Sequence, residues 1–313
     1  MSHSIQRNKR LYGYLCGVLS GVAYGTNPLF GLPLITEYQM PVDTVLFYRY
    51  GSATICMFIY CLCRRTLGKV TFRQFWLLLV LGILFSMSSL CLFNSYNYIP
   101  SGIATTIIYT EPVLVAIIMV AMKKYPTWQK WVAIAVSFIG VVFLCHPDAS
   151  AEYHWPGFLL AFLSALSYAF YLVIVNCSKR IKKISASFLG MITLLVGSIL
   201  FFVQAIPHGI APIFDWKEFG LVMGLGLVPT VGSLVTMTYA TRTVGATTTA
   251  ILGVMEPITA ICIGVALFNE PLTIYIILGF VITASAIIFM TYTDKKANDE
   301  DSQITKTSCE IKE

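Results

Sequence analysis

Long apolar runs, separated by short polar connections, follow one another along almost the whole chain. They occupy residues 12–34, 44–63, 74–95, 101–121, 130–146, 157–178, 186–206, 218–240, 246–267 and 272–292. Because a membrane-spanning helix needs about 20 mostly apolar residues, the pattern predicts ten transmembrane helices. We therefore expect an all-α integral membrane protein, with a short segment at 1–11 before the first helix. The polar residues 293–313 at the other end read as a disordered tail.

The composition agrees with a membrane protein, and the placement of charge predicts its orientation. Hydrophobic residues make up 57% of the chain and charged residues only 12%, whereas soluble domains carry about 25% charged residues. All of the 21 Lys and Arg residues except Arg49 and Lys217 fall in the termini or in loops on the same side as the termini. Since positive residues accumulate in cytoplasmic loops, both termini are expected in the cytoplasm. This distribution explains the net charge of +6 without a nucleic-acid partner.

The two halves of the chain carry related patterns of small and polar residues. At an offset of 144, the first and third helices match the sixth and eighth. The first set is Gly13, Gly17, Ser20, Tyr24 and Asn27 against Gly157, Ala161, Ser164, Tyr168 and Tyr171; the second is Gly82, Ser86, Ser89 and Phe93 against Gly226, Thr230, Ser233 and Met237. Glu111-Pro112 matches Glu256-Pro257 at an offset of 145. The repeats cover 12–146 and 157–292, with five helices each.

An odd number of helices in each repeat makes the second copy enter the membrane from the opposite side. The predicted fold is therefore two inverted five-helix repeats. Inverted repeats are typical of secondary transporters, in which the substrate site lies near the middle of the membrane between the repeats. The pattern thus favours a transporter that works by alternating access.

Residues 12–292 also resemble a known family, the EamA-type members of the drug/metabolite transporter superfamily. The resemblance rests on the order of motifs: Glu256-Pro257, then Glu270 with Leu272-Thr273, then Gly279 early in the last helix. It implies export or exchange of polar metabolites, including amino acids, and names no single cargo. The first repeat departs from the motif, since Lys123-Lys124 stands where Glu270 would have its counterpart.

Glu111 and Glu256 are the acids placed deep in predicted helices, and each precedes a proline. Pro112 and Pro257 cannot donate to the carbonyls four residues earlier, at Ile108 and Gly253, so we expect a kink at each motif. A charge at the middle of a membrane costs on the order of 3 kcal/mol or more, which favours a polar cavity at this depth. The carboxylates could bind an amine of the substrate or carry a proton. Alternatively, they only stabilise the kinks.

Further polar and aromatic side chains are candidates for the same site. They are Tyr24, Asn27, Ser89, Tyr168, Tyr171, Ser233 and Arg49. The tyrosines could stack on a substrate ring or merely pack helices together. Arg49 could contact a substrate carboxylate or phosphate; it could equally extend to the outer surface or pair with Asp43.

The expected function is secondary transport of a small polar metabolite, such as an amino acid, a related amine or a nucleobase. We expect net export, driven by a proton or a counter-substrate, across a bacterial inner membrane. A passive channel, a scaffold or receptor, and an intramembrane enzyme are the alternatives. The nine cysteines and four histidines show no metal-ligand or catalytic spacing, so no cofactor or metal is predicted. The sequence is compatible with a monomer or a homodimer.

Overall fold

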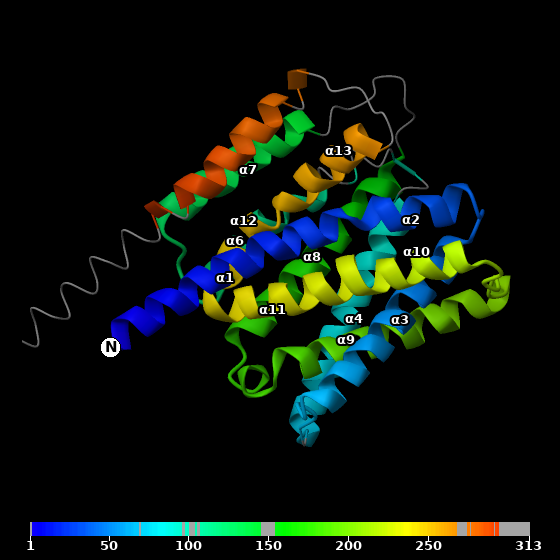
Figure 1. Cartoon of the computed structure of the whole chain (residues 1–313). Coiled ribbons are helices and arrows are strands. Elements are labelled where there is room, and N and C mark those ends of the chain that lie inside the picture. Colours follow the sequence, from blue (N-terminus) through cyan, green and yellow to red (C-terminus); the bar gives the residue numbers. More distant parts are fainter. Residues whose placement is uncertain are drawn as a thin grey trace, which may run out of the picture.

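The computed structural model describes residues 2–68, 70–95, 98–99, 104, 107–144, 154–267, 274–275, 277–290 and 292–293. Glu270, Leu272-Thr273 and all of the tail beyond Thr293 lie outside this part, so the predictions about them stay predictions. Within the described part the chain forms the following helices (Figure 1): α1 (Ser2–Gly25), α2 (Asn27–Thr36), α3 (Val42–Cys63), α4 (Phe72–Ser95), α6 (Glu111–Ala121), α7 (Trp128–Leu144), α8 (Trp155–Cys177), α9 (Ala186–Ala205), α10 (Trp216–Gly226), α11 (Ser233–Thr243), α12 (Ala246–Leu252) and α13 (Met255–Leu267), with a further helix over Ile277–Met290.

Many of these helices are long and apolar enough to cross a membrane. In the described residues, seven spans meet this condition: Lys9–Ile35, Val42–Cys63, Phe72–Ser95, Trp155–Cys177, Ala186–Ala205, Trp216–Thr243 and Ala246–Leu267. Three shorter apolar helices occupy Glu111–Ala121, Trp128–Phe143 and Ile277–Met290. The expectation of an all-α membrane fold is confirmed for this part of the chain. Two of the three short helices border residues that the structure does not describe, so the count of ten spans stays a prediction.

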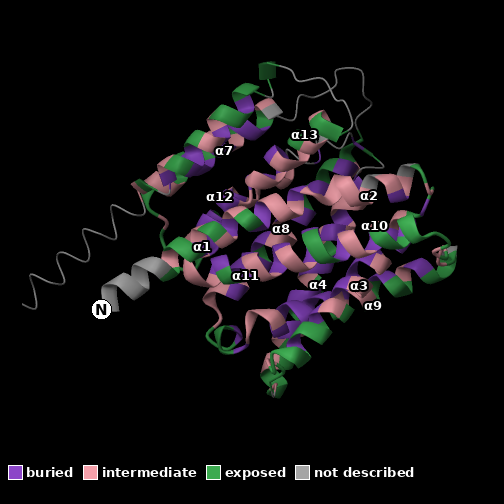
Figure 2. Cartoon of the chain, viewed as in Figure 1, coloured by how far each residue is buried: buried purple, intermediate pink, exposed green. Residues whose placement is uncertain are grey.

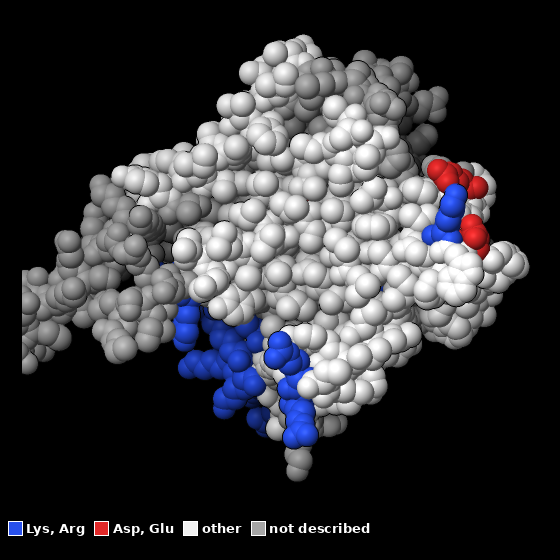
Figure 3. Space-filling model, in the orientation of Figure 1, with Lys and Arg blue, Asp and Glu red and all other residues white. Residues whose placement is uncertain are grey.

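Burial separates the interior of the bundle from its outer surface. Buried residues lie between the helices, and exposed ones point outward along their length (Figure 2). Many exposed side chains are large and apolar, for example Ile55 at 62%, Val203 at 58% and Ile288 at 68% exposed. Such a surface suits hydrocarbon rather than water. On the face shown in Figure 3, most Lys and Arg atoms gather at one end of the molecule, and Asp and Glu atoms lie at the other end with a small basic group beside them.

Contacts between the two repeats are reciprocal. A Cβ atom on Gly13 of α1 would lie 2.9 Å from Val244, beyond the end of α11. A Cβ on Gly157 of α8 would lie 2.8 Å from Ile99, beyond the end of α4. The second contact repeats the first with the halves exchanged, as two repeats related by a twofold rotation require.

Two other glycines repeat this relation deeper in the bundle. Gly82 of α4 packs directly against Val196 of α9. Its counterpart Gly226, at the end of α10, packs directly against Ser52 of α3. Both partners are themselves related by the offset of 144, so helix pairs α4–α9 and α10–α3 use one packing arrangement twice.

A pair of serine contacts fixes the register of the repeats near the middle of the bundle. Ser20 Oγ donates to the carbonyl oxygen of Ser233 at 3.0 Å, and the two hydroxyls are 3.2 Å apart. In the other half, Ser164 Oγ donates to the carbonyl oxygen of Ser88 at 2.7 Å, with hydroxyls 3.1 Å apart. The structural counterpart of Ser233 is therefore Ser88, and the sequence alignment that paired it with Ser89 is wrong by one residue.

The cause of this shift is a π-helical turn, η3 (Leu227–Gly232), between α10 and α11. A π-turn accommodates one residue more than an α-turn, so the offset changes from 144 before it to 145 after it. Pro229 cannot donate to the carbonyl of Leu225, and the Thr230 hydroxyl donates to that oxygen instead, at 2.8 Å. The turn also accounts for the offset of 145 between Glu111 and Glu256.

Candidate functional site

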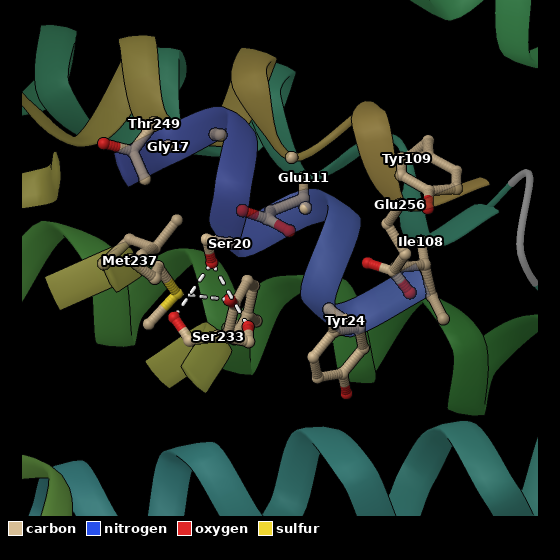
Figure 4. Close-up of a pocket in the computed structure, with 15 residues that line it drawn as sticks. Gly17, Ser20, Tyr24, Ile108, Tyr109, Glu111, Ser233, Met237, Thr249 and Glu256 are labelled. Atoms are coloured by element: carbon tan, nitrogen blue, oxygen red, sulfur yellow. Dashed lines mark hydrogen bonds between the residues drawn. The ribbon is translucent and has the colours of Figure 1, made fainter. Parts of the chain in front are cut away.

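A small cavity of about 40 Å³ lies where the two repeats meet (Figure 4). Its lining comes from both halves: α1 and the start of α6 belong to the first repeat, and α8, α11, α12 and the start of α13 belong to the second. Glu111 and Glu256 both line it, together with Ser20, Tyr24 and Ser233. The structure thus brings the two glutamates of the repeated motif to one cavity.

Each glutamate lies in the first turn of a helix, directly after a short non-helical turn. Turns precede α6 and α13, and Pro112 occupies the first turn of α6, where its missing N–H removes no helical hydrogen bond. The expectation of an unpaired carbonyl at Gly253 is wrong, because the Glu256 N–H donates to it at 2.9 Å. The local turn therefore replaces the bond that Pro257 cannot make.

Glycines on α1 bring this helix against the start of α13. A Cβ on Gly21 would lie 2.8 Å from the Cβ of Met255, and one on Gly25 would lie 2.5 Å from the carbonyl oxygen of Glu256. This close approach leaves Ser20 and Tyr24, on the same face of α1, lining the cavity beside Glu256.

Two tyrosines of α8 are stacked, with ring centroids 6.1 Å apart and an interplanar angle of 6°. Tyr168 lines the cavity, and its hydroxyl donates to the sulfur of Met237 on α11. Tyr171 is fully buried behind it, outside the lining. Tyr168 alone of the two is therefore placed to meet a solute in the cavity.

Arg49 of α3 is held inside the protein. It is only 3% exposed, so the alternative in which it extends to the outer surface is wrong. Its Nε donates to the Thr230 hydroxyl at 2.8 Å, and its guanidinium carbon lies 5.3 Å from the centre of the Tyr24 ring. The π-turn and α1 together fix this cation behind a side chain of the cavity.

Two other candidates lie outside the cavity lining. Ser89 is buried, and its hydroxyl is 2.7 Å from that of Tyr50. Asn27 begins α2, and its buried Oδ1 has no hydrogen-bond partner among the described residues. Their spacing placed both on polar helix faces, but Ser89 contacts α3, and Asn27 lies beyond Gly25, where α1 has already ended.

Sequence reasoning missed several residues of the lining. Tyr109 precedes the first Glu-Pro motif and is a hydrogen-bond partner of Glu256. Thr249 and Met237 contribute from α12 and α11. Ser20 lay on the repeated stripe, and its position between Gly17 and Gly21 was a usable signal. Within the described residues, no group of three or more His, Cys, Asp or Glu side chains could hold a metal ion.

Apolar outer surfaces, reciprocal contacts between the repeats and a cavity lined by two glutamates together describe an integral membrane protein whose two halves line one cavity. The chain belongs to the EamA-like transporter family, whose model matches residues 11–145 and 155–292. This match confirms the resemblance found in the sequence.

Its relatives among known proteins are named as transporters. An uncharacterized transporter of Synechocystis is 27% identical over 67% of this chain and 65% of its own length. One of Archaeoglobus fulgidus is 26% identical over 86% of this chain and 92% of its own length. An S-adenosylmethionine uptake transporter of Rickettsia bellii is 29% identical over 63% of this chain and 66% of its own length.

The fold is also similar to that of solved structures. One crystal structure matches with a TM-score of 0.76 over 91% of this chain and 98% of its own, at 16% sequence identity. At this identity the likeness concerns the fold alone.

Proposed function

We propose that this protein is a secondary transporter that moves a small polar metabolite across the cytoplasmic membrane by alternating access. The observation that carries the proposal is the cavity, because Glu111 from one repeat and Glu256 from the other both line it. In transporters built from repeats, a site at this junction can be exposed to either side by rocking one half against the other.

The lining favours a cargo with an amine or another cationic group. Two carboxylates attract positive charge, and the Tyr24 and Tyr168 rings offer faces on which a cation or a flat ring can lie. Amino acids, related amines and nucleobases fit this description. One relative is named for uptake of S-adenosylmethionine, so a nitrogen-rich metabolite is a suitable first cargo to test.

The proposed topology has ten spans in two inverted repeats, with both termini in the cytoplasm and a bacterial inner membrane as the location. Reciprocal contacts between the repeats support the twofold relation. The gathering of Lys and Arg at one end of the molecule supports the orientation. A proton or a counter-substrate is the proposed driving partner for export.

The test is transport into proteoliposomes that contain the purified full chain. Labelled arginine, putrescine, adenine and S-adenosylmethionine form the panel, each assayed with and without a proton gradient. We expect saturable uptake of at least one solute, accelerated when the same unlabelled solute is loaded inside. Saturable counterflow identifies a transporter, whereas a channel gives flux without counterflow and an enzyme gives a new product.

Neutral variants of the two glutamates complete this experiment. Glu256→Gln should lose most of the flux or its dependence on pH, because the amide cannot carry a proton or a full negative charge. Glu111→Gln is compared in parallel. Unchanged flux at every pH in both variants would rule out a role for the carboxylates in coupling.

A further inference from the structure

The two repeats supply equivalent glutamates but unequal surroundings. Arg49 of α3 corresponds to Thr193 of α9 at the offset of 144. Both side chains are buried, at 3% and 0% exposed, yet only the first repeat carries a charge at this position. The charge of the site is therefore asymmetric although the Glu-Pro motifs repeat.

Arg49 is held in place by the π-turn, which among the described residues occurs in the second repeat only. Thr230 accepts from the Arg49 Nε and donates to the Leu225 carbonyl, which Pro229 has left without its usual donor. In the other half, the chain runs through the α-helix α4 without such a turn. The π-turn thus forms a binding site for the Arg49 guanidinium, in which the Thr230 hydroxyl accepts the hydrogen bond from Nε. We call this site the seat of Arg49.

Tyr24 links this cation to one of the two glutamates. The guanidinium lies over the Tyr24 ring, and Tyr24 lines the cavity with Glu256. Gly25, next in the chain, lets α1 approach the Glu256 backbone. Gly21 and Gly25 lie before and after Tyr24 on α1, and both lie against backbone atoms of Glu256. Arg49 therefore lies behind the part of α1 that packs on Glu256, and none of these α1 glycines lies against Glu111.

A buried guanidinium needs a negative partner, and removal of one member of a buried pair leaves an uncompensated charge. We infer that Arg49 is the internal counter-ion of Glu256, and that Glu111 is the carboxylate that receives the cationic group of the cargo. The second half of this inference rests on the proposed function; the first does not. Arg49 is then a positioning residue that sets the net charge of the site.

The stability of the purified protein in detergent tests the counter-ion directly, without any cargo. Arg49→Gln and Glu256→Gln should each lower the Tm by several degrees, and the double variant by clearly less than the two effects together. Arg49→Gln combined with Glu111→Gln should show no such compensation. Additive effects in the first pair, or compensation in the second, overturn the inference. Arg49→Lys, which keeps the charge, checks that any loss comes from charge rather than from volume.

The flux of labelled arginine, putrescine and S-adenosylmethionine tests the division between the glutamates. Arg49→Gln and Glu256→Gln should each lose about tenfold or more, and the Arg49→Gln/Glu256→Gln double variant should recover much of that loss. Glu111→Gln should stay inactive whether or not Arg49 is also changed. Recovery with Glu111→Gln instead, or with neither, overturns the assignment. A wild-type protein that moves none of these solutes contradicts the proposed function for this panel and leaves the stability test decisive for the counter-ion.

Matched variants of Thr230 test the seat itself. Thr230→Val removes the hydroxyl and should weaken the Tm coupling between Arg49 and Glu256, whereas Thr230→Ser keeps the hydroxyl and should preserve it. Thr193→Val, the counterpart of Arg49 in the other repeat, should leave the coupling unchanged. Equal coupling in Thr230→Val and Thr230→Ser would show that the π-turn does not position the cation.

Discussion

At the scale of single residues, the close approach of the α1 backbone to α13 determines which side chains line the cavity. Gly25 lies against the carbonyl oxygen of Glu256, and this contact keeps Tyr24 in the lining. A backbone oxygen cannot move aside as a flexible side chain can, so any larger residue at this position must separate α1 from α13.

Gly25→Ala should therefore destabilise the protein by about 1–3 kcal/mol, because the added methyl group overpacks the contact. Gly220→Ala is the control, since a Cβ at Gly220 of α10 would meet nothing within 4 Å. Thermal unfolding in detergent measures both. A Tm for Gly25→Ala equal to that of Gly220→Ala would contradict the close approach.

The sequence could predict the glutamates but not their neighbours. A repeated Glu-Pro pair in an apolar run is visible in one chain, and its position predicts a shared depth. Which helix faces which is a property of packing, so the sequence could not show that Ser89 contacts α3 or that α1 ends before Asn27. Arg49 lies between two tyrosines in the chain, and spacing alone does not show whether it points inward or outward.

At the scale of helices, the π-turn is the feature that the spacing of apolar and polar residues in the sequence does not reveal. Residues on both sides of Leu227–Gly232 follow ordinary α-periodicity, and only the structure shows that the turn between them holds an extra residue. The alignment of the third and eighth predicted helices was therefore correct up to Gly226 and displaced by one residue at Ser233 and Met237, whereas the Glu-Pro motifs were already aligned at the offset of 145.

Deletion of Val228 tests this interpretation. Removing one residue from a π-turn allows a continuous α-helix, with α10 and α11 still presenting their present faces. The protein should therefore fold, although the seat of Arg49 is lost. Deletion of the repeat counterpart Leu84, in the ordinary helix α4, rotates all later residues of that helix by about 100° and should prevent folding. Yield and monodispersity on size exclusion report the outcome; equal behaviour of the two deletions contradicts the interpretation.

At the scale of the whole molecule, the arrangement of the repeats and the distribution of charge give separate information. The reciprocal contacts relate the two halves, while the distribution of Lys and Arg predicts their orientation in the membrane. Hydropathy alone located the apolar segments well, since each described helix falls within or overlaps a predicted run. It could not show breaks inside runs, such as the one between α12 and α13, because a buried break is as apolar as a continuous helix.

The orientation is tested by labelling intact cells with a membrane-impermeant maleimide. Cys63, exposed at the end of α3, is kept as the sole cysteine in one variant, and Lys217→Cys is the sole cysteine in the other. The proposed topology requires that Lys217→Cys is labelled from outside and that Cys63 is labelled only after permeabilisation. The reverse pattern would place the termini outside.

The π-turn also bears on the energetics of the proposed alternating-access cycle. Two identical inverted halves could exchange conformations and would give inward-open and outward-open states of equal free energy. The seat of Arg49 lies in one half alone, so the inward-open and outward-open states need not have equal free energies. The hydrogen bonds of Arg49 can be more favourable in one state than in the other. A difference of about 1.4 kcal/mol is enough for a tenfold bias. A single inserted residue can thus give the resting carrier a preferred side and make its apparent affinity for the same solute differ between the two faces of the membrane.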